Sequence, residues 1–252
     1  MECKFKRICK NANTDKCNIE CFPYVVLHGT SGHGGYWGSR RTPKKYDNCF
    51  LDTLPIAKDN PKAYGVISKY CKDVLGYALD KRVGLFLYSI PNKDNRLGTG
   101  TGKTTSAITI LNEYLIARVK QQLEDGFKLG DCPVMFIKLS ELQNIYNAQF
   151  RGTREIQEES SIRYYRLKKR MMVTELLVVD DIGVRDLTDA FKNELFEIID
   201  HRATEEVTTI CTSNYPLDKL NEFLGERIVS RIDGMTYKLG FEGKDHRQGG
   251  LF

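Results

Sequence analysis

Apolar residues form two alternating patterns from about residue 60 onward. Short, continuous apolar runs predict strands that are buried on both faces, at 83–90, 133–139, 175–180, 207–212 and 235–240. Between the runs, apolar residues at helical spacing predict helices at 62–80, 103–119 and 187–203. Further helices are expected at 140–149, in the polar segment 154–172, and in two short segments at 216–223 and 226–233. This alternation predicts an α/β fold, with a parallel sheet covered by helices on both faces.

Residues 1–50 are short on both patterns and are rich in Cys, Gly, Asn and Lys. A segment of this length and composition cannot bury enough apolar surface to fold alone, so we expect something to staple it. The sequence therefore predicts two domains, a small N-terminal module at 1–58 and a larger α/β domain at 59–252.

Half of the eight cysteines fall close together near the start of the chain, and these are Cys3, Cys9, Cys17 and Cys21. Four thiolates around Zn²⁺ would supply the staple, since metal binding then acts as folding energy. The spacings match no common C-x₂-C pair, so free thiols are the alternative. His28 or His33 could replace one of the four ligands.

The charge of the chain is unevenly spread. Residues 1–60 hold ten Lys/Arg against six Asp/Glu, whereas the remainder is nearly neutral. A basic module favours an anionic partner, with nucleic acid the first candidate and ordinary solubility the alternative. The sequence has no apolar run of about 20 residues and no signal-peptide core, so we expect a cytoplasmic protein that does not enter a membrane.

A glycine-rich turn follows the predicted strand 83–90 and precedes a predicted helix. So few Cβ atoms allow successive backbone N–H groups to face one anion, and the helix N-terminus adds its positive end. Lys103 would reach the outer phosphates and the Thr104 hydroxyl would contact Mg²⁺. The residues predicted to hold a nucleoside triphosphate here are Gly98, Thr99, Gly100, Thr101, Gly102, Lys103, Thr104 and Thr105.

One position departs from the usual phosphate-binding loop (P-loop). The glycine normally found six residues before the lysine is replaced by Leu97, and Gly98 comes one step late. Gly100 and Gly102 are in place, where the backbone comes closest to phosphate. We therefore expect an altered start to the loop and a retained site.

Polar side chains follow the next two predicted strands. Asp180 and Asp181 end the run Leu-Leu-Val-Val-Asp-Asp, and Asn214 follows strand 207–212. Because the carboxyl ends of parallel strands meet at one edge of a sheet, we expect all three beside the P-loop. Asp180 would hold Mg²⁺, Asp181 would polarise or deprotonate the attacking water, and Asn214 would contact that water and the γ-phosphate. The alternatives are exposed strand-end acids and an asparagine in a turn before Pro216.

Three clusters of basic residues suggest contacts with partners. Arg227 and Arg231 lie one helical turn apart, which suits an arginine finger for a neighbouring subunit or a surface ion pair. The segment 163–170 interleaves aromatic and basic residues, as in a single-strand-binding surface or, equally, an amphipathic helix with inward tyrosines. Around Trp37, at 37–45, four basic residues favour docking to a protein.

Together these landmarks resemble AAA+ ATPases, and more specifically DnaC/DnaI-type replicative helicase loaders, closest to their phage-encoded branch. The resemblance covers most of the chain and is weakest at 40–60 and 150–170. The segments that carry it are 84–89, 180–185, 212–216, 225–232 and 241–247, together with the cysteine-containing stretch 17–29.

The resemblance implies what the protein does. It implies a slow ATPase stimulated by single-stranded DNA, contact with a hexameric helicase through the N-terminal module, contact of the AAA+ body with the DNA, and self-association through AAA+ interfaces. It also makes Arg231 the first choice for the arginine finger and Arg227 the second. Relatives often have glutamate where this chain has Asp181, and the shorter side chain should slow hydrolysis. An IstB-type transposition ATPase and a nucleotide-dependent adaptor without turnover are the alternatives.

Overall fold

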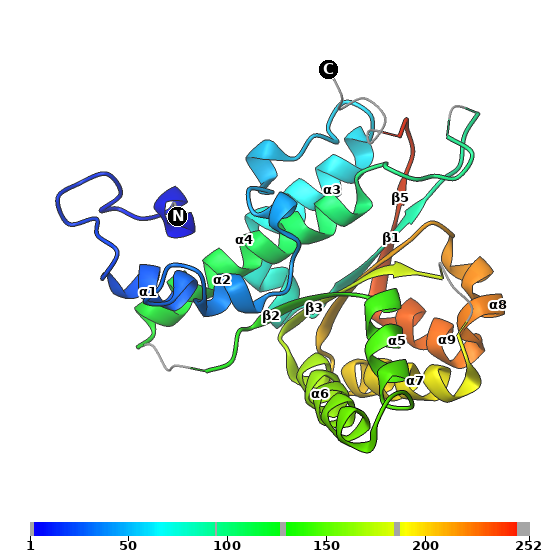
Figure 1. The fold of residues 1–252 in the computed structure, drawn as a ribbon. Coiled ribbons are helices and arrows are strands. Elements are labelled where there is room, and N and C mark those ends of the chain that lie inside the picture. Colours follow the sequence, from blue (N-terminus) through cyan, green and yellow to red (C-terminus); the bar gives the residue numbers. More distant parts are fainter. Residues whose placement is uncertain (1–2, 94, 127–129, 184–186, 246–252) are drawn as a thin grey trace.

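The fold is built on a five-stranded parallel sheet in the order β2-β3-β4-β1-β5 (Figure 1). This computed structural model describes residues 3–93, 95–126, 130–183 and 187–245. The strands are β1 (Gly84–Ser89), β2 (Val134–Lys138), β3 (Leu176–Ile182), β4 (Thr208–Ser213) and β5 (Thr236–Phe241). Each lies within two residues of its predicted position, and every pairing is parallel. The predicted α/β class is thus confirmed.

The helices cover both faces of this sheet (Figure 1). Their bounds are α1 (Phe22–His28), α2 (Gly35–Ser39), α3 (Pro61–Lys72), α4 (Lys103–Glu124), α5 (Leu139–Ala148), α6 (Arg154–Val173), α7 (Asp189–Thr204), α8 (Asn221–Leu224) and α9 (Glu226–Met235). Among the described helices, none combines the length and the apolar character that crossing a bilayer requires.

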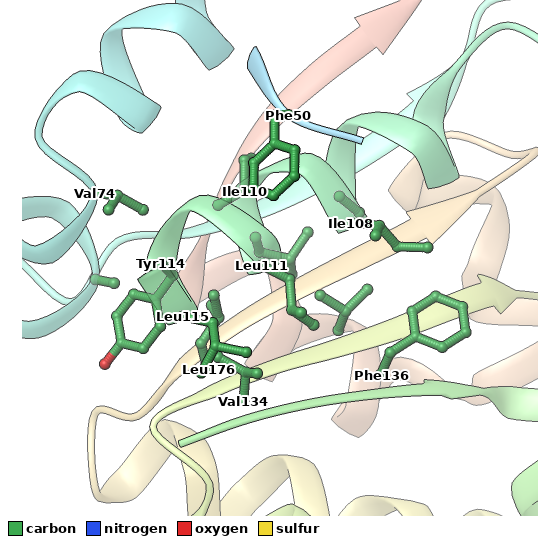
Figure 2. Packing of buried hydrophobic residues seen from close by; sticks show 14 of the residues in the cluster. Phe50, Val74, Ile108, Ile110, Leu111, Tyr114, Leu115, Val134, Phe136 and Leu176 are labelled. Carbon is green, nitrogen blue, oxygen red and sulfur yellow. The ribbon is translucent and has the colours of Figure 1, made fainter. Parts of the chain in front are cut away.

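Alternate residues of each strand enter two separate cores. Leu85 and Leu87 of β1 belong to the cluster that contains α3 and α4, whereas Phe86 belongs to the cluster formed by α5, α6, α7 and α9. Figure 2 shows the first cluster, where Leu111 and Leu115 of α4 lie over the sheet. This two-sided burial explains why the strands read as continuous apolar runs.

The predicted helix 62–80 is shorter in the structure. α3 ends at Lys72, because Asp73 leaves the helical region with φ −132° and ψ 49°. The chain then makes a separate π-helical turn at Gly76–Asp80 before entering β1. The apolar spacing continues across this break, so periodicity alone predicted one longer helix.

The N-terminal segment is held by the core of the α/β domain. Trp37 and Phe50 are buried in the same cluster as Ile108 and Tyr114 of α4. This shared core supplies the stabilisation that a segment of this size needs. Packing against α4 therefore provides the stabilisation that the N-terminal segment was expected to need.

Two buried polar residues fix this packing. Asn112 of α4 donates from Nδ2 to the carbonyl oxygens of Tyr46 (3.2 Å) and Cys49 (2.9 Å). Its Oδ1 accepts a hydrogen bond from Arg40 Nε at 3.2 Å. The Arg40 guanidinium lies over the Trp37 ring, 3.8 Å from the ring centroid. The backbone carbonyl of Arg40 accepts a hydrogen bond from the backbone N–H of Phe136 in β2. These bonds satisfy polar groups that burial would otherwise leave unpaired.

His28 should make the stability of this segment depend on pH. Its side chain is fully buried, and Nε2 accepts from the backbone N–H of Lys4 at 3.1 Å. Burial lowers the pKa of His28 from 6.5 to about 4, with Lys4 and Arg40 adding to the effect. Because the folded pKa is depressed, the stabilisation is complete above pH 6.5 and is lost as the pH falls toward 4. The neutral, buried His28 side chain can contribute at most about 3 kcal/mol to the free energy of unfolding.

The measurement is the free energy of unfolding of wild type and His28→Asn between pH 7 and pH 4. Asparagine keeps a hydrogen-bonding side chain but does not titrate in this range, so the advantage of wild type should shrink on acidification. His33→Asn, at an exposed position, should keep the pH profile of wild type. Parallel profiles for wild type and His28→Asn would contradict the prediction.

Candidate functional site

The P-loop lies between the end of β1 at Ser89 and the start of α4 at Lys103. Gly98, Gly100 and Gly102 all have positive φ, at 59°, 66° and 96°. Residues with a Cβ rarely adopt this conformation, so the glycines are what allow the chain to fold back onto the helix. A turn of glycine-rich backbone therefore leads directly into the N-terminus of the 22-residue helix α4. This geometry is suited to binding phosphate.

The lysine of the loop is held at its base. Lys103 is buried, and its ammonium donates to Ser89 Oγ at 2.5 Å and to the Gly98 carbonyl at 3.0 Å. Ser89, which sequence reasoning missed, therefore helps to position the ammonium group of Lys103. Its place at the end of a buried strand directly before the loop was the available signal.

The altered start of the loop also centres on Ser89. Leu97 has 76 % of its surface exposed and lies outside the turn. A Cβ on Gly98 would come 2.3 Å from Ser89 Cβ, and Ser89 Oγ donates to the Gly98 carbonyl. Gly98 is thus the residue whose backbone packs closely against Ser89, and the P-loop begins one residue later than usual.

The residues predicted to hold Mg²⁺ are in direct contact. Asp180 Oδ1 accepts from Thr104 Oγ1 at 2.8 Å and from Thr212 Oγ1 at 2.7 Å. Asp180 Oδ2 is buried without a hydrogen-bond partner among the described residues. Burial, followed by the charge of Asp181, raises the pKa of Asp180. An orphaned carboxylate oxygen beside a threonine hydroxyl fits the oxygen ligands that Mg²⁺ requires.

Asp181 has an unusual backbone that follows from the end of β3. The pairing of β3 with β4 shifts register between Val179 and Ile182, and Asp181 adopts a left-handed conformation with φ 58°. Its backbone N–H donates to Thr212 Oγ1 at 3.0 Å. Aspartate tolerates this conformation better than glutamate does, which gives a physical reason for the shorter acid here.

A cavity of about 330 Å³ unites these residues. Residues 100–105 of the P-loop line it together with Asp181 and Asn214. Its volume falls at the lower end of the roughly 300–1,000 Å³ usual for ligand pockets. The structure therefore brings together the P-loop, the strand-end acid and the asparagine predicted from separate parts of the sequence.

Another wall of this cavity comes from the N-terminal segment, which sequence reasoning missed. The lining residues there are Lys45, Tyr46, Cys49, Pro55 and Ile56. A Cβ on Gly102 would come 2.4 Å from Ile56 Cγ2, so this wall directly contacts the P-loop. Nothing in the local sequence at 45–56 marks it as part of a nucleotide site.

A second contact missed by sequence reasoning reaches the loop after β5. Thr99 Oγ1 donates to Asp245 Oδ2 at 2.8 Å, and a Cβ on Gly100 would come 1.7 Å from Asp245 Oδ1. The side chain of Asn95 donates to the carbonyls of both Thr99 and Gly243. The segment after β5 is thereby bonded to the start of the P-loop.

The two candidate arginine fingers lie away from this cavity on α9. Arg231 Nε forms an ion pair with Asp200 Oδ1 of α7 at 2.7 Å, and half of its side chain is exposed. The Arg227 guanidinium lies over the Phe196 ring, 3.9 Å from its centroid. Neither arginine is among the described residues that line the cavity of its own chain.

The predicted zinc site is not supported. Among the described residues, no group of three or more His, Cys, Asp or Glu side chains is arranged to hold a metal ion. Cys3, Cys9, Cys17 and Cys21 are partly buried free cysteines. Burial raises the pKa of Cys3, with smaller contributions from Cys21 and Cys17. Packing against α4 supplies the stabilisation for which zinc was invoked.

Comparison with known proteins gives one family match and several relatives. Residues 134–235 match the family described as IstB-like ATP binding protein. The replicative helicase loader DnaC of Buchnera aphidicola subsp. Schizaphis graminum is 25% identical over 205 residues, 81% of this chain and 71% of that protein. DnaC of Escherichia coli strain K12 is 26% identical over 133 residues, 53% of this chain and 46% of that protein.

Solved structures show the same fold. The crystal structure of the DnaC helicase loader has a TM-score of 0.56 at 23% identity and covers 79% of this chain and 99% of that one. The crystal structure of DnaI has a TM-score of 0.56 at 19% identity and covers 82% of this chain and 95% of that one. AMPPCP-bound DnaA from Aquifex aeolicus has a TM-score of 0.52 at 20% identity, and the match covers 79% of this chain and 51% of that one.

These comparisons confirm the resemblance to an IstB/DnaC-like ATP-binding domain. The family match spans Asp180, Asp181, Asn214 and both arginines, and it begins after the P-loop with its altered start. Four residues in the segments that carried the resemblance lie outside the described residues, namely Val184, Arg185, His246 and Arg247.

Proposed function

We propose that this protein is an ATP-dependent loader that binds a hexameric replicative helicase and helps to place it on single-stranded DNA. The similarity to proteins named replicative helicase loader DnaC supports this function. The observation that carries its ATP-dependent part is the convergence of the P-loop, Asp181 and Asn214 on one cavity.

In this proposal each residue of the site has a separate role in ATP hydrolysis. Lys103 and the loop backbone bind the phosphates, while Thr104 and Asp180 hold Mg²⁺. The cation supplies charge neutralisation on the outer phosphates when bound. Asp181 accepts a proton from the attacking water, and Asn214 orients that water. Hydrolysis is slow in isolation and increases when single-stranded DNA is bound.

The remaining parts of the chain serve assembly. Residues 1–58 dock the helicase and residues 59–252 form the AAA+ ATPase domain, which self-associates in the cytoplasm of a bacterium or of a phage-infected host. Arg231, or Arg227 as second choice, reaches the γ-phosphate held by the neighbouring subunit. The surface position of Arg231 on α9 supports this role, since half of its side chain is free of protein cover.

Replacement of Lys103 with alanine tests the nucleotide site. Loss of a charge-assisted contact of about 1.5–3 kcal/mol should weaken ATP binding at least about tenfold. Calorimetric titration with ATP and Mg²⁺ measures this, with Lys62→Ala on α3 as a variant of the same charge change outside the site. Undiminished affinity in Lys103→Ala would rule out the proposed ATP site.

The loading function needs a separate measurement, because the family match also favours an IstB-type transposition ATPase. Native mass spectrometry of the purified protein with a hexameric replicative helicase, with and without ATP, should detect a complex. A transposase of the IS21 type serves as the competing partner. Binding to the transposase without binding to the helicase would favour the alternative function.

A further inference from the structure

The segment 163–170 is divided by the structure into an inner and an outer face. Tyr164 is fully buried, and its hydroxyl donates to Glu194 at 2.9 Å. Lys168 is also buried and forms ion pairs with Glu194 and Glu197 of α7 at 2.7 and 2.5 Å. These residues attach α6 to α7, so the inward half of the motif is accounted for by packing. Arg163 and Arg166 are exposed on the other face.

Four arginines line one cavity on this outer face. The cavity has a volume of about 370 Å³, and its lining residues are Arg41, Glu159, Ile162, Arg163, Arg166, Leu167 and Arg170. Arg163 and Arg166 form no ion pair with any residue in the described part of the chain. With a single carboxylate among the lining residues, the site is strongly cationic and should attract an anion.

The N-terminal segment supplies the fourth arginine through a strained backbone. Arg41 has φ 66°, a conformation that a residue with a Cβ adopts at a cost of roughly 1–2 kcal/mol. An ion pair with Glu141 of α5 holds its side chain, yet its Nε–H has no hydrogen-bond partner among the described residues. Strain that brings a cation to a cationic cavity favours a binding role over chance placement.

We propose that this cavity binds the phosphate backbone of single-stranded DNA, an inference that rests on the proposed loading function. Arg163, Arg166 and Arg170 recur at helical spacing and extend over about 10 Å of the helix axis. That length admits two successive phosphates, and planar guanidinium groups match phosphate oxygens in pairs. Arg170 also donates from Nη2 to the carbonyl of Ser39 at 2.6 Å, which fixes its guanidinium beside the cavity. Ile162, which is 59% exposed at the cavity, offers an apolar surface for a base.

The test compares R163A/R166A with wild type in binding a fluorescent oligo-dT by anisotropy at several salt concentrations. Loss of two contacts to charged groups should weaken binding at least about tenfold. The slope of log affinity against log salt should also fall by about 1.4, since each single-strand phosphate contact contributes about 0.7. ATPase activity without DNA should be unchanged, whereas its stimulation by DNA should be lost.

K62A/K69A on α3 is the matched control, because it removes two exposed positive charges elsewhere. It should bind oligo-dT with nearly the affinity and salt slope of wild type. If R163A/R166A also kept both values, the DNA site would lie elsewhere and the inference would fail while the loading function stood. A variant that bound DNA normally but lost the helicase would reassign the cavity to a protein contact and overturn the inference. If wild type bound no oligo-dT, the DNA part of the proposed function would fail as well.

Discussion

Asp181→Asn should lower the rate of ATP hydrolysis by about 10²–10⁴-fold while leaving ATP affinity intact, because it removes the proposed acceptor of the water proton. Asparagine tolerates the left-handed conformation at this position. It also keeps the backbone N–H that donates to Thr212. Lys103, Thr104 and Asp180 remain in place, so the loss should be confined to the chemical step.

Single-turnover hydrolysis and calorimetric ATP titration separate the two effects. Asp181→Glu is the companion variant, since it restores a carboxylate at the cost of placing a longer side chain at φ 58°. It should hydrolyse ATP faster than Asp181→Asn and unfold at a lower denaturant concentration than wild type. If Asp181→Asn matched wild type in both hydrolysis and helicase loading, the protein would be an adaptor that uses ATP without turnover.

Arg202→Met should lower the free energy of unfolding by about 3–5 kcal/mol, because several buried acceptors lose hydrogen bonds to a charged donor that contribute about 1.5–3 kcal/mol each. Arg202 is fully buried, and its guanidinium joins the end of α6 to the start of β4. Its acceptors are the carbonyl oxygens of Met171 (2.6 Å), Thr174 (2.9 Å) and Thr208 (2.5 Å) and the Thr209 hydroxyl (2.8 Å). Burial lowers the pKa of Arg202 to about 9, so the group stays charged at neutral pH.

Urea unfolding monitored by circular dichroism measures this loss. Methionine fills much of the same space but removes the guanidinium donors that bond these acceptors, so part of their desolvation is uncompensated. Arg154→Ala, at an exposed position on α6, should change stability by less than about 0.5 kcal/mol. A loss below about 1 kcal/mol for Arg202→Met would mean that water replaces the guanidinium.

The core and most of the nucleotide site could be predicted because their signals are local. Strand β3 reads as a buried run that ends in Asp180 and Asp181, and the glycines at 98, 100 and 102 directly precede α4. Parallel strands bring their carboxyl ends to one edge, so knowledge of the fold class was enough to predict that these residues meet. Each such prediction needed only a pattern within about ten residues.

What could not be predicted depends on contacts between distant segments. Ile56 reaches Gly102, and Asn112 of α4 binds the carbonyl of Cys49, but no sequence period connects these positions. For the same reason the cysteines near the N-terminus suggested zinc, since the apolar partner that holds this segment lies on α4. The left-handed backbone of Asp181 follows from the register shift between β3 and β4, which only pairing reveals.

The bond between Thr99 and Asp245 has a consequence for biosynthesis. Asp245 is translated 146 residues after Thr99, and β5, which pairs with β1, is translated shortly before it. A nascent chain therefore lacks this contact to the P-loop until the ribosome has extruded β5 and the residues that follow. Since a ligand stabilises only a conformation that it can bind, cellular ATP should assist folding late, after all five strands of the sheet have been synthesised.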